Sequence, residues 1–379
     1  MITSSRADYG LLRPLLSEIS RDKKLHLQLI VSGMHLASSF GLTYREIESD
    51  GFKIDERIDI SLTSDGTSDI ARSMGIGLRG FVKAYQRLKP DICVVLGDRF
   101  EIFTAAVAAL ISRIPLAHLY GGEVTAGAFD DAFRHSITKM SHLHFTATER
   151  YRQRIIQLGE SPKRVFSVGA LGLDNIEDLK LLSKKEIEEK FGFKFKACNL
   201  LITFQPVTLE EKRGVEEFGN LLGVLDSLKD TLLIFTKANA DPGGRAINKM
   251  IDRYVTENRE KAVVFASLGH LNYLSIMRYT DGVIGNSSSG IIEAAVLRIG
   301  TVNIGDRQRG RIRLKSIIDC APTKDELKKA IKRLYSSQFR RGLKNLTNPY
   351  GTKDVAKKIK DVLKNWRLRD ILKKDFYDL

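Results

Sequence analysis

Short runs of apolar and β-branched residues alternate with longer segments of helical periodicity along the whole chain. This alternation is typical of βαβ units and predicts an α/β fold built on parallel sheets. In the first half the predicted strands are 25–31, 92–96, 114–119, 143–146 and 165–168. The pattern begins again in the second half, with predicted strands at 200–204, 232–235, 262–265, 282–284 and 301–304. The sequence therefore predicts two sheets in two domains.

The segment 174–196, rich in Lys, Glu and Leu at helical spacing, lies between the two sets of strands. We expect the chain to cross there from an N-terminal domain, residues 1–171, to a C-terminal domain, residues 172–353. Residues 354–379 have the pattern of one or two amphipathic helices, and analogy with other two-domain folds predicts that they pack back on the first domain. Residues 1–6 read as the end of a first strand and its loop, so we expect a missing upstream segment or a shortened strand.

Length and composition agree with this organisation, because 379 residues exceed the size of a single core and 43% hydrophobic content is typical of folded proteins. No apolar stretch reaches the roughly 20 residues that a membrane-spanning helix needs. The sequence has no signal-peptide pattern, and its three cysteines are far apart, so we predict a cytoplasmic, reduced protein.

The net charge of +15 is compatible with binding to nucleic acid, to an anionic membrane or to a phosphorylated small molecule. The cations are spread over helical stretches such as 184–196 and 324–341, with acidic residues among them. The aromatic residues of an RNA-binding platform are missing from these stretches. We therefore predict a solvated basic surface and no nucleic-acid or membrane partner, with nucleic-acid binding as an alternative that rests on charge alone.

A glycine pattern of the dinucleotide-binding type, GIGLRG, occupies residues 75–80. That motif requires a preceding strand and a helix that opens after it, whereas these glycines lie within a helical pattern over 68–87. They predict close packing of a helix. The sequence also has no GxxxxGK[ST] loop, zinc-type cysteine pair or GxSxG turn, so NAD, ATP and serine-hydrolase functions lose their usual support.

Carboxylates follow two predicted strands of the first half: strand 92–96 runs into GDRFE at 97–101, and strand 114–119 runs into YGGE at 120–123. Open α/β sheets bind ligands at the carboxyl edge of their strands. We expect Asp98, Glu123 and Asp131 to converge there as acid and base groups, since crowded like charges separate their pKa values. The alternatives are helix capping by Asp98, Asp130 or Asp131, and a surface position for Glu123.

In the second half, GNSSSG at 285–290 follows a predicted strand and opens a predicted helix at 291–297. Small residues, hydroxyl groups and a helix N-terminus together predict an anion site, with Glu293 in reach of ribose hydroxyls. Arginines at 307, 309, 311 and 313 follow another strand end, where a diphosphate could bind. The alternative is a polar N-cap beside a basic surface loop.

With these motifs the chain resembles the hydrolysing UDP-N-acetylglucosamine 2-epimerases of sialic and related nonulosonic acid synthesis, nearly from end to end. The resemblance rests on SRADYG at 5–10, GDRFE at 97–101, GGEVTAG at 121–127, RHSITKMSHLH at 134–144, VGA at 168–170 and GNSSSG at 285–290. It implies the GT-B architecture, in which two Rossmann-like domains face each other across a cleft. UDP is then held mainly by the second domain, and the sugar faces the first.

By resemblance, Asp98, Glu123 and Asp131 are the catalytic residues. The implied substrate-binding residues are Arg6, Arg99, Arg134, His135, Gln205, Asn239, Ser287, Ser288, Glu293 and Arg307. The implied chemistry removes the C2 proton, expels UDP to give a 2-acetamidoglycal, and adds water with inversion at C2, without metal or NAD. The resemblance also implies a homo-oligomer, a dimer or tetramer.

One position departs from the family pattern: Gln205 precedes Pro-Val-Thr, where the family usually has histidine. An amide forms hydrogen bonds but carries no proton near neutral pH, so reduced or retuned activity is expected. Our leading hypothesis is a hydrolysing 2-epimerase that forms N-acetylmannosamine, or its 2,4-diacetamido-6-deoxy analogue, and UDP. The alternatives are a non-hydrolysing epimerase, a retaining glycosyltransferase and a non-catalytic nucleotide-sugar binding protein.

Overall fold

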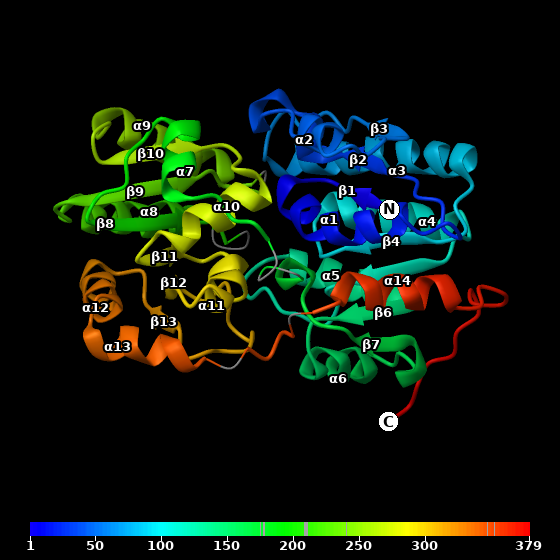
Figure 1. Cartoon of the computed structure of the whole chain (residues 1–379). Helices are drawn as coiled ribbons and strands as arrows, with labels where there is room; N and C mark the ends of the chain where they lie inside the picture. Colours follow the sequence, from blue (N-terminus) through cyan, green and yellow to red (C-terminus); the bar gives the residue numbers. More distant parts are fainter. Residues whose placement is uncertain (175, 177–178, 208–210, 240, 347, 352) are drawn as a thin grey trace. The chain divides into compact units, whose positions relative to one another are not determined.

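The structure is a computed structural model that describes residues 1–379 except 175, 177–178, 208–210, 240, 347 and 352. The chain divides into two compact units. Unit 1 comprises Met1–Glu123, Phe129–Ile176 and Pro349–Leu379, and unit 2 comprises Val124–Ala128 and Glu177–Asn348. Both contain parallel strands that alternate with helices (Figure 1), which confirms the predicted α/β fold.

The sheets of unit 1 have the strand orders β1-β2-β3 and β4-β5-β6-β7, with every pairing parallel. β1 also contacts β4. The strands are β1 (Ile2–Thr3), β2 (Ile30–Ser32), β3 (Glu56–Ile58), β4 (Cys93–Leu96), β5 (Leu116–Leu119), β6 (Leu143–Thr146) and β7 (Val165–Ser167). The helices are α1 (Arg6–Ser20), α2 (Tyr44–Ser49), α3 (Thr67–Leu88), α4 (Phe100–Ile111), α5 (Asp130–Met140), α6 (Glu149–Gln157) and α14 (Val355–Asn365).

The sheet of unit 2 has the order β10-β9-β8-β11-β12-β13 and is parallel throughout. Its strands are β8 (Cys198–Thr203), β9 (Thr231–Thr236), β10 (Ala262–Phe265), β11 (Gly282–Gly285), β12 (Gly300–Ile304) and β13 (Ile317–Cys320). The helices are α7 (Lys184–Phe191), α8 (Glu211–Asp226), α9 (Gly244–Glu257), α10 (Gly269–Arg278), α11 (Glu293–Val296), α12 (Lys324–Leu334) and α13 (Ser337–Gly342).

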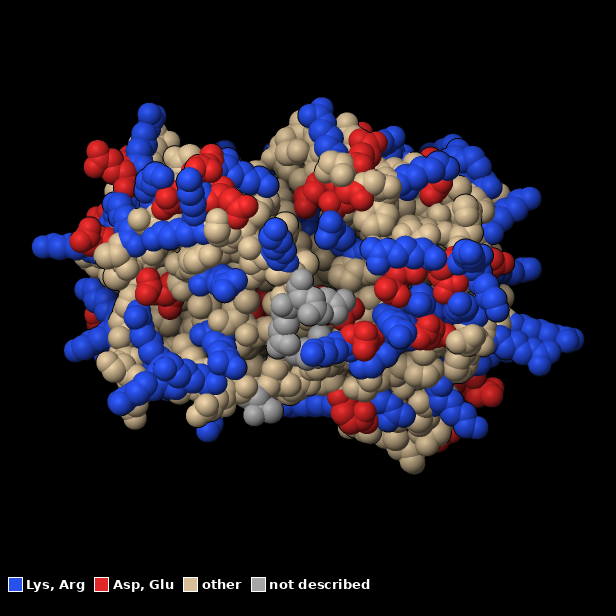
Figure 2. All heavy atoms as spheres, viewed as in Figure 1, with Lys and Arg blue, Asp and Glu red and all other residues tan. Residues whose placement is uncertain are grey.

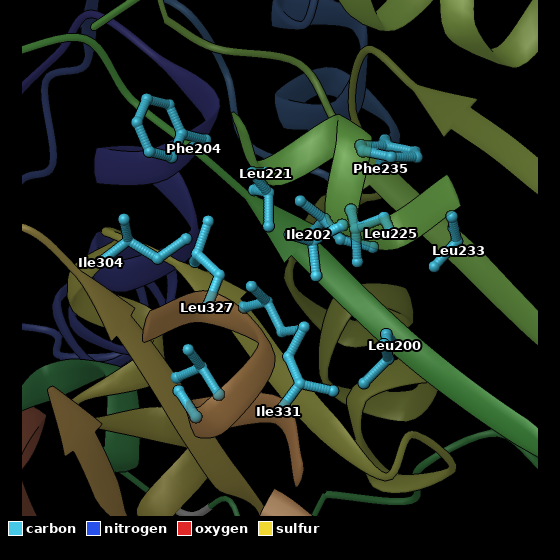
Figure 3. Packing of buried hydrophobic residues seen from close by; sticks show 14 of the residues in the cluster. Leu200, Ile202, Phe204, Leu221, Leu225, Leu233, Phe235, Ile304, Leu327 and Ile331 are labelled. Carbon is cyan, nitrogen blue, oxygen red and sulfur yellow. The ribbon is translucent and has the colours of Figure 1, made fainter. Parts of the chain in front are cut away.

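Apolar side chains pack against both faces of the unit 2 sheet. Successive side chains of a strand point to opposite faces, so neighbouring residues of β8 belong to different cores. Leu200 and Ile202 of β8 pack in one core with Leu221 of α8 and Leu327 of α12 (Figure 3). The residue between them, Leu201, belongs to a second core on the other face. Apolar side chains on both faces explain why this strand reads as a continuous apolar run.

Most predicted strands are confirmed to within two residues, but the prediction for 25–29 is wrong, since β2 begins at Ile30. β2 is paired with β1 and with β3 in register from Ile30 onwards. The strands β3 and β13 were not predicted. The helical pattern over 174–196 yields only α7, with 175 and 177–178 outside the described residues. Of the one or two helices expected over 354–379, the described residues contain α14 alone.

The C-terminal segment lies in unit 1, where α14 contacts α1. Beyond α14, Arg164 donates hydrogen bonds to the carbonyl groups of Ile371 and Lys373 at 3.0 and 3.1 Å. The ammonium group of Lys374 lies 2.8 Å from the carboxylate of the buried Glu160. These contacts fix the segment on the surface around β7.

The glycine pattern at 75–80 lies inside α3, as predicted. A Cβ atom at Gly80 would lie 2.6 Å from Cγ2 of Ile58, and one at Gly77 would lie 3.2 Å from Cγ2 of Ile60. Close packing therefore explains two of the three glycines, whereas a Cβ atom at Gly75 would meet nothing within 4 Å.

Lysine and arginine side chains are scattered over the face seen in Figure 2, with acidic side chains among them. None of the described helices is long and apolar enough to cross a membrane.

Candidate active site

In unit 1, Arg134 joins the ends of two neighbouring strands. Its Nη2 donates to the Oδ2 of Asp98, directly after β4, and its Nη1 donates to the carbonyl oxygen of Tyr120, directly after β5, at 2.9 Å. Arg134 itself is buried and projects from α5. The N-cap of α4 is Arg99, which makes no capping hydrogen bond through its side chain, so Asp98 does not serve as a helix cap.

Glu123 is not a surface carboxylate, because only 1% of it is exposed. It follows Gly122, where a Cβ atom would lie 2.4 Å from the carbonyl oxygen of Tyr151 and where φ is +75°. Tyr120, two residues before Gly122, has a φ of 65°, which is a strained conformation for a residue with a side chain. Strain of this kind concentrates at functional sites.

Asp131 and His135 lie one turn apart on α5, with 3.6 Å between Oδ2 of Asp131 and Nε2 of His135 and about 30% of each side chain exposed. The N-cap of α5 is Phe129 and the helix begins at Asp130, so neither Asp130 nor Asp131 occupies the capping position that the alternative gave it. Both residues still lie in the first turn, where negative charge interacts favourably with the helix dipole.

Arg154 interacts electrostatically with both Glu123 and Asp131, which the sequence did not indicate. Its Nη1 donates to the carbonyl oxygen of Gly122. Burial lowers the pKa of Arg154, while the charges of Asp131 and Glu123 act on it in the opposite direction. Both carboxylates therefore lie within electrostatic reach of one guanidinium group.

His118, on β5, supports the turn that carries Asp98. Its Nε2 lies 2.8 Å from the carbonyl oxygen of Gly97, and its Nδ1 lies 3.1 Å from Oγ1 of Thr138. Burial lowers the pKa of His118 to about 3, so the ring is neutral near pH 7. Because a carbonyl group only accepts, Nε2 carries the proton and Nδ1 accepts from the threonine hydroxyl.

Two further predicted residues of unit 1, Arg6 and Arg99, lie near the ends of β1 and β4. Arg6 is the first residue of α1, directly after the N-cap Ser5. Arg99 donates to Oε1 of the buried Glu101 at 3.2 Å. The sequence offered no sign that Glu101 is buried as the partner of Arg99.

In unit 2, three strand ends are joined through Gln205. Its backbone N–H donates to Oδ1 of Asn286, and the Nδ2 of Asn286 donates back to its carbonyl oxygen, both at 2.7 Å. Its Oε1 accepts from the backbone N–H of Asn239 at 2.9 Å. Arg307 and Gln308 donate to the carbonyl oxygen of Asn286 at 3.1 and 2.7 Å. Thus Gln205, Asn239 and Arg307 come together around Asn286.

The serines after β11 form a tight turn. Ser287 accepts from the backbone N–H of Ser289 at 3.3 Å and caps a 3-10 turn over Ser288–Gly290. The predicted helix 291–297 is wrong, because α11 spans only the four residues from Glu293. A helix this short has little dipole, so an anion here would depend on hydroxyl groups, backbone N–H groups and Arg307.

The chain leaves unit 1 directly after Glu123, since Val124–Ala128 belong to unit 2. There the backbone N–H of Ala126 donates to the carbonyl oxygen of Arg307 at 3.1 Å. The segment that follows the catalytic candidate Glu123 is thus anchored to the loop that carries Arg307.

The fold is that of UDP-N-acetylglucosamine 2-epimerases of known structure. The Neisseria meningitidis enzyme bound to UDP-GlcNAc superimposes with a TM-score of 0.79 at 16% identity, covering 96% of this chain and 98% of that one. The S. aureus MnaA structure with UDP gives a TM-score of 0.79 at 16% identity, covering 100% and 98%.

Residues 17–364 match the model of the UDP-N-acetylglucosamine 2-epimerase family. The chain is 46% identical to the GDP/UDP-N,N'-diacetylbacillosamine 2-epimerase (hydrolyzing) of Campylobacter jejuni, over 100% of this chain and 98% of that protein. It is 36% identical to the UDP-N,N'-diacetylbacillosamine 2-epimerase (hydrolyzing) of Legionella pneumophila, over 86% and 85%. The polysialic acid biosynthesis protein P7 of Escherichia coli is 38% identical over 100% and 96%. The chain belongs to the UDP-N-acetylglucosamine 2-epimerase family.

Proposed function

We propose that the protein is a hydrolysing 2-epimerase that converts a UDP-linked 2-acetamido sugar and water into UDP and the free sugar inverted at C2. The observation that carries the proposal is the 46% identity to a hydrolysing 2-epimerase along the full chain. The relatives from C. jejuni and L. pneumophila are both named for N,N'-diacetylbacillosamine. The first substrate to test is therefore the UDP-linked 2,4-diacetamido-2,4,6-trideoxy sugar, with UDP-GlcNAc as the second.

In the proposed reaction a carboxylate removes the C2 proton while the bond from C1 to the UDP oxygen breaks, which leaves a C1–C2 double bond. Water then adds its hydroxyl group to C1, and a proton returns to the opposite face of C2. Two faces require two differently placed acid and base groups, and we assign these roles among Asp98, Glu123 and Asp131. The burial of Glu123 and the ion pair of Asp98 with Arg134 support this assignment.

On the basis of family membership we assign nucleotide binding to Arg6, Arg99, Gln205, Asn239, Ser287, Ser288, Glu293 and Arg307. Arg134 and His135 are assigned to the sugar. Because the Oε1 of Gln205 accepts from Asn239, its amide nitrogen is suited to donate to a phosphate oxygen. The amide transfers no proton to departing UDP. Family membership is also the basis on which we propose a cytoplasmic homo-oligomer.

The test is proton NMR of the protein in D2O with each UDP-sugar in turn. The expected products are UDP and a free, C2-inverted sugar that carries deuterium at C2. Asp98→Asn and Glu123→Gln should lower kcat about 10²- to 10⁴-fold and leave UDP binding intact. Asp91→Asn, at the exposed opposite end of β4, is the matched control and should retain activity.

Each rival function predicts different products or different UDP binding in this experiment. A non-hydrolysing epimerase would give two UDP-sugars in equilibrium and no free sugar. A nucleotide-sugar binding protein would bind UDP without turnover, and a nucleic-acid binding protein would be indifferent to UDP. Any of these results would overturn the proposal.

A further inference from the structure

Asp8, in the first turn of α1, accepts more hydrogen bonds than the capping of a helix requires. Its Oδ1 accepts from the backbone N–H groups of Ser5 and Tyr9, both at 2.8 Å, and from the hydroxyl of Thr3 at 2.9 Å. Its Oδ2 accepts from the N–H and the hydroxyl of Ser4 at 2.8 and 3.0 Å. The residue is only 5% exposed. A capping box alone needs one bond from this side chain.

The same network extends through a buried histidine to the segment after β2. Nε2 of His35 lies 3.0 Å from Oγ1 of Thr3, and its Nδ1 lies 2.7 Å from Oγ1 of Thr43. Since the Thr3 hydroxyl gives its proton to Asp8, Nε2 of His35 must be the donor to Thr3. Burial lowers the pKa of His35, so the ring is neutral and its Nδ1 accepts from Thr43. The hydrogen bonds therefore have one direction, from Thr43 to Asp8.

Gly33 packs closely against the turn that Asp8 holds. A Cβ atom at Gly33 would lie 2.9 Å from the carbonyl oxygen of Ser4 and 3.0 Å from Oε1 of Glu101. Glu101 in turn accepts from Arg99. The turn between β1 and α1 thus has little freedom, and its last residue leads directly into Arg6.

We propose that Asp8 is a positioning residue that fixes the turn 4–6 and so presents Arg6 to the diphosphate of the substrate. This inference rests on the proposed function, because it requires UDP as the ligand of Arg6. The carboxylate of Asp8 accepts from the backbone N–H groups of Ser4 and Ser5, and a Cβ atom at Gly33 would lie 2.9 Å from the carbonyl oxygen of Ser4. In an Asp8→Asn variant, the amide NH2 group would face N–H and hydroxyl donors in place of a carboxylate oxygen. The bonds that hold the turn 4–6 would then be lost.

The experiment is a double-mutant cycle on UDP affinity, measured by isothermal titration calorimetry. Asp8→Asn should weaken UDP binding about ten- to a hundredfold, as expected when a binding group is misplaced by about 1 Å. In the Arg6→Ala background the same change should alter affinity less than about threefold, because the group it positions is gone. Thr3→Val, which removes one bond to Asp8, should give a smaller loss and covers the case in which Asp8→Asn does not fold.

Asp50→Asn is the matched control. Asp50 also binds α1, but further along the helix, where it accepts from Tyr9 and Arg13 at 2.6 and 2.7 Å. It should lower the melting temperature and leave UDP affinity unchanged. A merely structural Asp8 would behave like Asp50, or would weaken UDP binding equally in both backgrounds, and either result overturns the inference. If the wild type binds no UDP, the proposed function falls together with the inference; if it binds UDP and responds to Arg6→Ala but not to Asp8→Asn, only the inference falls.

Discussion

Lowering the pH from 7 to 5 should destabilise unit 1 through the buried imidazole of His118. The ordinary pKa of histidine is 6.5, and burial lowers the pKa of His118 to about 3 in the folded state. The hydrogen bond to the Gly97 carbonyl raises the pKa and offsets the effect of burial only in part. The folded pKa is depressed, so the stabilisation is complete above pH 6.5 and is lost as the pH falls towards 3. At pH 5 the unfolded chain binds a proton that the folded chain does not. Over these roughly 1.5 pH units the loss is about 2 kcal/mol.

The measurement is urea unfolding of the wild type and of His118→Gln at pH 7 and at pH 5. The glutamine amide can still donate to Gly97 but does not titrate, so the decrease in the free energy of unfolding should be about 2 kcal/mol smaller in the variant. His26→Gln removes an exposed histidine and should leave the wild-type pH dependence in place. Equal pH dependence in the wild type and in His118→Gln would refute the reasoning.

Two further predictions concern stability away from this histidine. Gly80→Ala should destabilise the protein by about 1–3 kcal/mol, since its Cβ atom would overlap Ile58. Gly75→Ala, in open space on the same helix, should stabilise the protein by up to about 1 kcal/mol. Thermal unfolding of both variants measures these changes, and changes of the same sign would refute the packing explanation. Gln205→Leu removes the acceptor of the Asn239 N–H and should cost about 1–2 kcal/mol, which urea unfolding measures, and unchanged stability would show that this bond contributes nothing.

The sequence by itself determined the α/β class, most strands and the motifs at their ends. Apolar runs such as 92–96 and 200–204 are buried on both faces of a parallel sheet, and this burial produces a local pattern that a reader of the sequence can recognise. The motif GDRFE and the residues YGGE follow their strands directly, so their place at the carboxyl edge also followed from the sequence. The helical surroundings of the glycines at 75–80 were also predicted from the sequence.

Only the tertiary structure decided which distant residues meet. The sequence placed Asp98 and Glu123 at strand ends, but the bonds of Arg134 to Asp98 and of Arg154 to Gly122 depend on helices that are remote in the chain. Strand length was decided in the same way, because β2 covers only the residues that are in register with β1 or β3, although the apolar pattern begins earlier. Periodicity is a local property of the chain, whereas pairing, burial and the charge around a carboxylate are set by segments that only folding brings together.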